Sequence, residues 1–160
     1  MDVEYGITRE ALIILFTYSR SVILLTKGGK RSMRDFDLLA ANAHRVMYGA
    51  TLVFMDDAEA LKHEPRAAPT SERMYALREA HSLGIKTWVS LEPVYNPEDT
   101  FALIEATQGY VDVYKVGKLN YMPEAKEIDW NKFAVEVEEK LKSTGKEYYI
   151  KSDLRRCLHE

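Results

Sequence analysis

Two spacings of hydrophobic residues alternate along the chain. Short continuous apolar runs, which are typical of strands buried on both faces, occur at 22–25, 46–54, 85–91, 111–116 and 146–150. Apolar residues at helical spacing lie before and between these runs, at 8–20, 33–43, 56–64, 71–83, 97–108 and 129–144. This order predicts strands that alternate with helices, and therefore a parallel α/β sheet built from βαβ units.

Residues that begin or end helices support these boundaries. We expect Thr8 and Ser71 to cap two helices, because their hydroxyls accept hydrogen bonds from the free amides of a first helical turn. Pro97 stands at the start of another helix, where its missing N–H is not needed. Gly84 and Gly145 follow two helical segments and are expected to end them.

Two parallel architectures fit the pattern: a doubly wound open sheet, and a β/α barrel or part of one. No Gly-x-Gly-x-x-Gly turn follows an expected strand, which disfavours a dinucleotide-binding sheet. Five strands are too few for a full barrel of eight. If these strands belong to a barrel, it is therefore a partial or half-barrel of about five strands alternating with five helices, and we expect a single domain over 1–160. Its unpaired strand edges predict self-association, because exposed edges pair with other chains.

Composition and charge place the chain among ordinary globular proteins. Of 160 residues, 46% are hydrophobic and 29% charged, which argues against a disordered chain. No apolar run approaches the ~20 residues of a membrane span, and the N-terminus lacks the pattern of a secretory signal, so we expect a cytoplasmic protein. The net charge is −3. The one dense basic cluster, at 27–34, is interpreted as a solvated loop rather than a nucleic-acid contact.

The cysteine count restricts the possible cofactors. Cys157 is the only cysteine, so no internal disulfide forms. A [4Fe–4S] cluster takes three or four cysteine ligands, and we expect this chain to bind none. The four histidines show no metal-ligand spacing, so no metal site is predicted.

Polar side chains gather where the expected strands end. Ligand sites of parallel α/β folds lie at the carboxyl ends of the strands, and the candidates there are Thr26, Lys27, Thr51, Ser90, Glu92, Lys118 and Asn120. Lys118 and Asn120 are two residues apart and share one side if the chain is extended. Two structural readings compete with ligand binding: a solvated Lys27, and an ion pair between Glu92 and Lys118.

Several segments resemble a known family. They are 5–12, 23–27, the run Glu-Pro-Arg-Ala-Ala-Pro at 64–69, 84–94, 116–121 and 148–151. In this order they resemble the C-terminal half of radical S-adenosylmethionine (SAM) proteins, in the DNA repair photolyase-like branch related to spore photoproduct lyase. The resemblance implies a partial β/α barrel that uses SAM and a [4Fe–4S] cluster to form a 5′-deoxyadenosyl radical. It also implies that Thr26, Lys27, Thr51 and Ser90 contact SAM, and that Glu92, Lys118 and Asn120 contact the substrate.

The chain departs from this family at one point. It lacks the CxxxCxxC loop that binds the cluster, so we expect the C-terminal portion of a barrel, from a truncated or split gene, that is not catalytic alone. Its catalytic residues stay unassigned. The expected partners are a second copy or an N-terminal, cluster-bearing chain, and nucleic acid is implied only by the family. Two alternatives stay open: a non-catalytic binding or oligomerisation half-barrel, and a lyase that uses Lys115 or Lys118.

Overall fold

Five parallel strands form one sheet, in the order in which they occur in the chain. The computed structural model describes residues 6–158. Its strands are β1 (Val22–Thr26), β2 (Val46–Thr51), β3 (Lys86–Val94), β4 (Val113–Lys118) and β5 (Glu147–Ile150). Each pairs in parallel with the next, giving the order β1-β2-β3-β4-β5. A doubly wound sheet reverses its order at a switch point, so the sequential order confirms the partial-barrel prediction.

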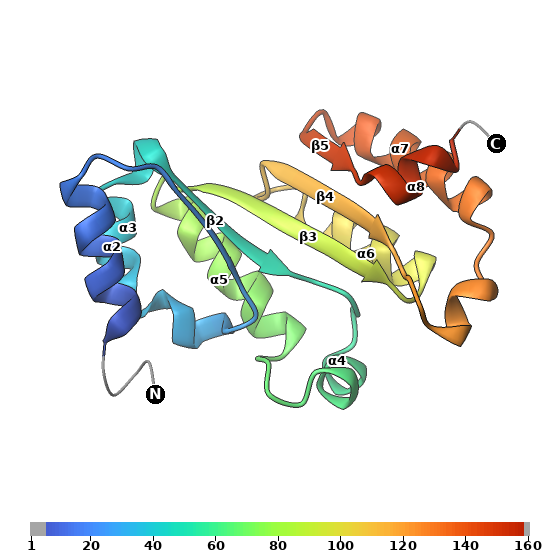
Figure 1. Cartoon of the computed structure of the whole chain (residues 1–160), viewed down its shortest axis with the longest axis horizontal. Helices are drawn as coiled ribbons and strands as arrows, with labels where there is room; N and C mark the ends of the chain where they lie inside the picture. The colour runs from blue at the N-terminus through green and yellow to red at the C-terminus, as the bar shows by residue number, and fades with distance from the viewer. Residues whose placement is uncertain (1–5, 159–160) are drawn as a thin grey trace.

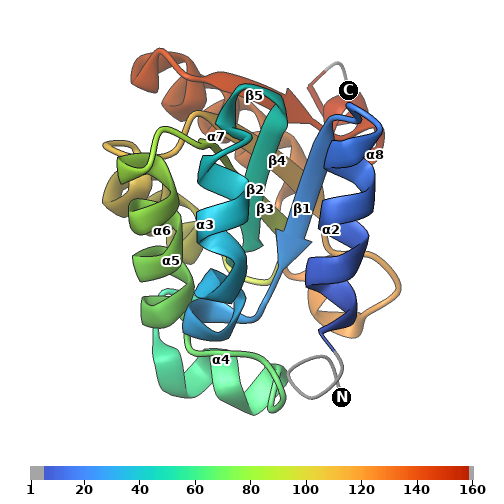
Figure 2. The same ribbon diagram turned by 90° about the vertical axis from the view of Figure 1, so that its left-hand side faces the viewer.

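Helices cover only one face of this sheet. The helices α3 (Phe36–Ala40), α5 (Thr70–Ser82), α6 (Pro97–Thr107) and α7 (Trp130–Thr144) lie behind the strands in Figure 1. Figure 2 shows the same layer from the side. Side chains such as Tyr48, Val89 and Val116 point into the layer between helices and sheet and are fully buried. We call the opposite face, which faces the viewer in Figure 1, the open face.

Three further helices of the described chain lie around the sheet. Helix α2 (Ile7–Thr17) lies beside the edge strand β1 and buries Leu12 and Phe16. Helix α4 (Asp57–His63) follows β2, and α8 (Ser152–Arg156) follows β5 and packs on β4 and α7. Residues 6–158 also contain three 3₁₀ segments: η1 (Gly29–Asp35), η2 (Ala43–Arg45) and η3 (Pro123–Lys126).

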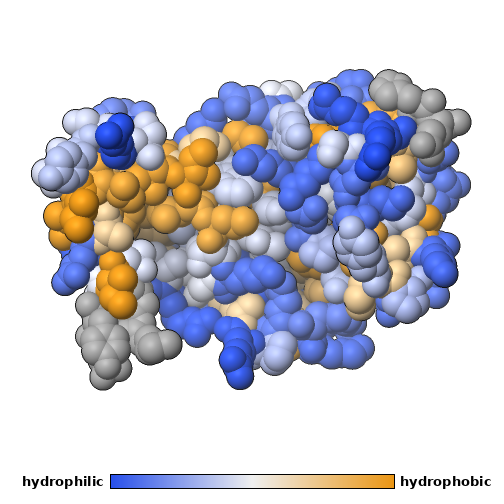
Figure 3. Space-filling view, viewed as in Figure 1, coloured by the Kyte–Doolittle hydropathy of each residue, from blue (hydrophilic) through white to orange (hydrophobic). Residues whose placement is uncertain are grey.

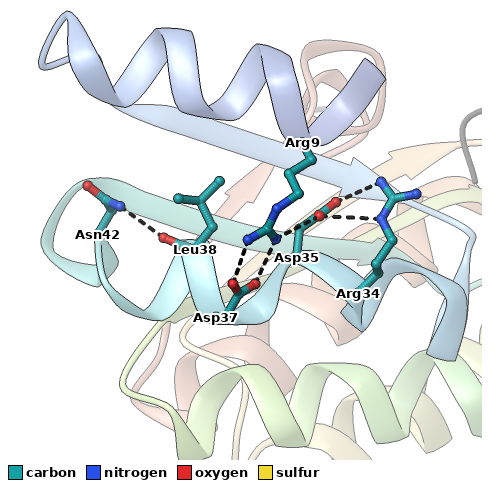
Figure 4. Close-up of polar contacts among 6 residues, drawn as sticks. All are labelled: Arg9, Arg34, Asp35, Asp37, Leu38 and Asn42. Atoms are coloured by element: carbon teal, nitrogen blue, oxygen red, sulfur yellow. Dashed lines mark hydrogen bonds and ion pairs between the residues drawn. The ribbon is translucent and has the colours of Figure 1, made fainter. Parts of the chain in front are cut away.

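A pair of ionic contacts fastens α2 to the rest of the molecule. The guanidinium of Arg9 donates two hydrogen bonds to the carboxylate of Asp37, at 2.6 and 2.9 Å, and one to Asp35 at 3.2 Å. Arg34 holds the other side of Asp35 at 2.8 Å. Figure 4 shows Arg9 reaching from α2 to these two carboxylates on η1 and α3.

Some boundaries differ from the sequence prediction. The helix expected over 33–43 is divided into η1, α3 and η2, and β2 ends at Thr51 rather than at 54. Strand β3 continues to Val94, and α8 was not predicted. The caps expected at two helices are wrong. Gly6 caps α2 in place of Thr8, and α5 begins one residue before Ser71, which instead donates its hydroxyl to Asp57.

Other predicted ends are confirmed. Gly84 and Gly145 both have positive φ, +75° and +66°, just after α5 and α7, which is the backbone conformation that favours glycine there. Helix α6 begins at Pro97, with the side chain of Asn96 accepting a hydrogen bond from the amide of Glu98 at 2.9 Å. Across residues 6–158, none of the helices has both the length and the apolar content to cross a membrane.

Candidate functional site

A polar row crosses the open face near the carboxyl ends of the strands. Thr51 of β2 is in register with Ser90 of β3, Ser90 with Lys115 of β4, and Lys115 with Tyr149 of β5. Side chains in register across parallel strands share a face of the sheet. Thr51 and Ser90 are nearly buried, yet within the described part of the chain neither hydroxyl has a hydrogen-bond partner. Two hydroxyls and an ammonium therefore stand side by side with bonding capacity to offer a ligand.

An ion pair lies next to this polar row, closer to the carboxyl ends of the strands. Glu92 of β3 pairs with Lys151, the residue after β5. Between them, β4 presents Gly117, where a Cβ atom would collide with the Glu92 carboxylate. The absence of a side chain at 117 thus lets Glu92 lie across β4. The alternative pairing of Glu92 with Lys118 is wrong.

The indole of Trp88 forms the floor beneath this polar row. Trp88 lies over Gly49 of β2, where any Cβ atom would overlap the ring. Its Nε1 donates a hydrogen bond of 2.9 Å to the carbonyl of Leu24, so the ring spans from β3 to β1. The Nζ of Lys115 lies 4.2 Å from the ring centroid, a distance at which the aromatic face attracts an ammonium. Lys115 is thereby held above the centre of the open face.

Lys27 lies at the end of β1 but already has a partner. Its Nζ is 2.5 Å from Oε1 of Glu64, whose Oε2 is 2.7 Å from the guanidinium of Arg73. Burial would raise the pKa of Glu64, but the hydrogen bonds from Lys27 and Arg73 outweigh that effect and lower the pKa. Lys27 is thus exposed to solvent and also paired with Glu64. A hollow of about 560 Å³ opens beside it, lined in part by Arg31 and Arg66.

Arg73 explains why the segment 64–69 is ordered there. Its side chain is 1% exposed and donates to the carbonyls of Ala68, at 2.7 Å, and Thr51, at 3.0 Å. The amide of Ala68 in turn donates to the carbonyl of Lys27 at 2.8 Å. A buried arginine thus ties this loop to the ends of β1 and β2, next to Thr51.

Three of the predicted site residues lie away from the open face. Thr26 lies two residues after Leu24 on β1 and, like Leu24, faces the helices. Its hydroxyl accepts a hydrogen bond from the amide of Gly28. Lys118 also faces the helices and lies 5.1 Å from the ring centroid of Trp130. Asn120 follows β4 and donates to Asp153 at 2.7 Å. Lys118 and Asn120 are thus not brought together with Glu92.

Thr51, Ser90 and Glu92 do converge, and the structure adds Lys115, Lys151 and Trp88 to them. Lys115 interrupts the apolar run of β4, so alternation along that strand would have indicated it, whereas Lys151 lies just after β5. Trp88 gave no such signal, because an aromatic residue inside an apolar strand is ordinary core.

The donor set of the molecule does not fit an iron–sulfur cluster. Cys157 is buried beside α8, and its thiol lies 3.7 Å from the carbonyl of Asp153. Over residues 6–158, no three His, Cys, Asp or Glu side chains come together in a way that could hold a metal ion. The open face does fit a small polar ligand, because Thr51 and Ser90 keep unpartnered hydroxyls there.

The arrangement of strands and helices defines a fold class, a parallel α/β partial barrel, and this fold is shared by solved structures. Structures of SuiB from Streptococcus suis are among those that share it. The SAM-bound form matches with a TM-score of 0.71 at 10% identity, over 92% of this chain and 37% of SuiB. The form bound to the precursor peptide SuiA matches with a TM-score of 0.69 at 11% identity, over 88% and 34%. The chain thus spans about a third of SuiB, and at this identity the likeness concerns the fold.

Comparison by sequence adds no relative. No family model matches the chain, and no curated protein matches it.

Proposed function

We propose that the chain is the carboxyl-terminal part of a radical SAM barrel whose open face binds SAM and a substrate. One observation carries this proposal: the unpartnered hydroxyls of Thr51 and Ser90 lie in register with Lys115, at the carboxyl ends of the strands. Parallel α/β folds bind their ligands at these ends. SuiB, whose fold is similar, was crystallised with SAM, which supports this ligand class.

The charges on the open face suit an amino-acid-like ligand. The Glu92 carboxylate binds the ligand's ammonium and Lys115 its carboxylate, with Lys151 shared between Glu92 and the ligand. The hydroxyls of Thr51 and Ser90 bind oxygens of either the carboxylate or a ribose. Lys27 borders the same end of the sheet, but its ammonium is shared with Glu64.

In this proposal the radical forms at a cluster that is held outside this chain. With a [4Fe–4S] cluster, SAM supplies a 5′-deoxyadenosyl radical, and the single cysteine of this chain leaves the cluster to be held elsewhere. The role of this chain is then to bind, orient and shield. Its affinity for SAM alone is expected to be weak, because the iron that anchors the amino acid group is missing.

Two classes of substrate have support: nucleic acid and peptide. The narrower assignment, to the DNA repair photolyase-like branch with nucleic acid as partner, is supported by the resembling segments such as 64–69 and 84–94. SuiB was crystallised with a precursor peptide, which supports a peptide instead. Glu92 and the two lysines accommodate charged groups of either substrate.

A second candidate function is that of a non-catalytic half-barrel that associates with another chain. The observation in its favour is that β1 is an edge strand, paired on one side by β2 alone. An unpaired parallel edge is a template for association.

Calorimetric titration with SAM tests the first proposal. Wild type should release heat with a weak Kd, and Thr51→Val should weaken binding roughly 3- to 10-fold by removing a hydrogen bond. Thr26→Val is the matched control, because Thr26 faces the helices, and it should leave the affinity unchanged. The absence of heat at millimolar SAM, or equal effects of both variants, would overturn the proposal.

A further inference from the structure

Helix α2 has a second apolar side that nothing in the described molecule covers. Its buried side carries Leu12 and Phe16. Ile7, Ala11 and Ile14, with Tyr18 at the C-cap, form another line of exposed positions, spaced by four, three and four residues. At 100° per residue these four positions point in nearly one direction, far from Leu12 and Phe16. This spacing is that of helices that pack lengthwise on another helix.

The apolar line continues onto the edge of the sheet. Ile23 and Leu25 of β1 are on the open face and in register with Met47 and Gly49 of β2. Figure 3 shows a single hydrophobic region over α2 and β1, whereas hydrophilic colours dominate the rest of that view. The α2–β1 surface is defined here as Ile7, Ala11, Ile14, Leu15, Tyr18, Ile23 and Leu25.

Most large side chains of the α2–β1 surface are at least half exposed. The exposed fractions of its five most exposed large side chains run from 50% for Leu25 to 72% for Tyr18. Contiguous apolar patches larger than the ~300–600 Å² of the largest patch on a typical monomer mark interaction sites. A standard interface buries ~800 Å² on each partner.

We propose that the α2–β1 surface is the interface of a homodimer in which two α2 helices pack antiparallel about a twofold axis. The axis passes between Ala11 and Ile14, so that Ile14 of one copy lies over Ala11 of the other. Ile7 then lies opposite Tyr18. Large side chains meet small ones in the middle of the contact, and the surface is complementary to itself, as a twofold interface requires.

The charges of α2 are compatible with this contact. Arg9 points away from the apolar line and is held by Asp35 and Asp37 (Figure 4). Glu10 flanks the line at its rim. The helical spacing also favours a second copy as the partner. A strand added to β1 would cover only Ile23 and Leu25, whereas a helix with the same spacing covers the whole length of α2. The dimer does not depend on ligand binding at the polar row.

Light scattering coupled to gel filtration tests the interface. At tens of micromolar, the wild type should be a dimer, and Ile14→Glu should be a monomer with an unchanged circular dichroism spectrum. Val135→Glu is the matched control: Val135 is 46% exposed on α7, away from the α2–β1 surface, and the variant should remain a dimer. A monomeric wild type, or the same mass for both variants, would overturn the proposal.

Cross-linking tests the geometry without weakening the contact. In a Cys157→Ala background, a mixture of Ala11→Cys and Ile14→Cys proteins should form a mixed disulfide on mild oxidation. Each protein alone should cross-link much less, because in the antiparallel arrangement equivalent positions lie apart. Self-cross-linking of each protein as strong as that of the mixture would contradict the twofold arrangement.

Discussion

Glu92 and Lys151 form an ion pair across β4, joining the third strand to the end of the fifth. The pair exists because Gly117 leaves the intervening strand without a side chain at that level. It fixes a carboxylate and an ammonium beside Thr51, Ser90 and Lys115. The pair therefore sets the charge pattern of the open face, which the proposed ligand has to match.

The close approach of Trp88 to β2 predicts a sharp effect of one methyl group. Gly49→Ala should lower the free energy of unfolding by about 1–3 kcal/mol, because the new Cβ overlaps the indole and forces the core to shift. Urea unfolding measures this change. Gly109→Ala is the control. Nothing lies within 4 Å of a Cβ atom added at this position, so the free energy of unfolding should change by no more than about 0.5 kcal/mol. Equal effects would contradict the packing of Trp88 over Gly49.

The order of the elements could be predicted from the sequence because apolar periodicity reports burial directly. The convergence of Thr51, Ser90 and Glu92 followed from the parallel order alone. The face of the sheet on which each side chain lies was harder to predict, because a shift of one residue moves a side chain to the opposite face. That is why Lys115 lies on the open face and Lys118 does not. The role of Lys151 was equally hard to predict, because its partner Glu92 is 59 residues away in the sequence.

The contact that fastens α2 predicts a specific loss of stability in acid. The hydrogen bond from Arg9 lowers the pKa of Asp37 from 3.8 to about 2. A lowered pKa stabilises the folded state above the ordinary pKa, and this contribution is lost as the pH falls towards the folded value. Thermal melts should therefore show a larger drop in Tm between about pH 5 and pH 2 for wild type than for Asp37→Asn. Parallel curves would contradict this role of Arg9 and Asp37.

The buried guanidinium of Arg73 depends on its counter-charge. Glu64→Ala leaves Arg73 without a carboxylate in a buried position and should cost about 3–5 kcal/mol of unfolding free energy. Glu59→Ala removes an exposed pair with Lys62 and should cost less than about 1 kcal/mol. Urea unfolding at neutral pH compares the two. A cost for Glu64→Ala no greater than that of the control would show that the loop does not depend on this ion pair.

The single cysteine predicts the outcome of iron reconstitution. After anaerobic incubation with iron and sulfide and removal of the excess, the protein should be colourless, because one thiolate does not hold a [4Fe–4S] cluster. Iron and sulfide analysis with a visible spectrum provides the measurement. Stoichiometric iron and sulfide, retained in Cys157→Ala, would refute the prediction.

The two indole groups of the chain provide the most direct test of the open face as a ligand site. Trp88 lies beneath the polar row, whereas Trp130 donates to the carbonyl of Ala125 and packs among the helices. In a ¹⁵N-labelled sample titrated with SAM, the Trp88 indole resonance should shift progressively while that of Trp130 stays in place. Assignment follows from a Trp130→Phe variant. An unmoved Trp88 resonance at millimolar SAM, or a shift of Trp130 instead, would contradict the account.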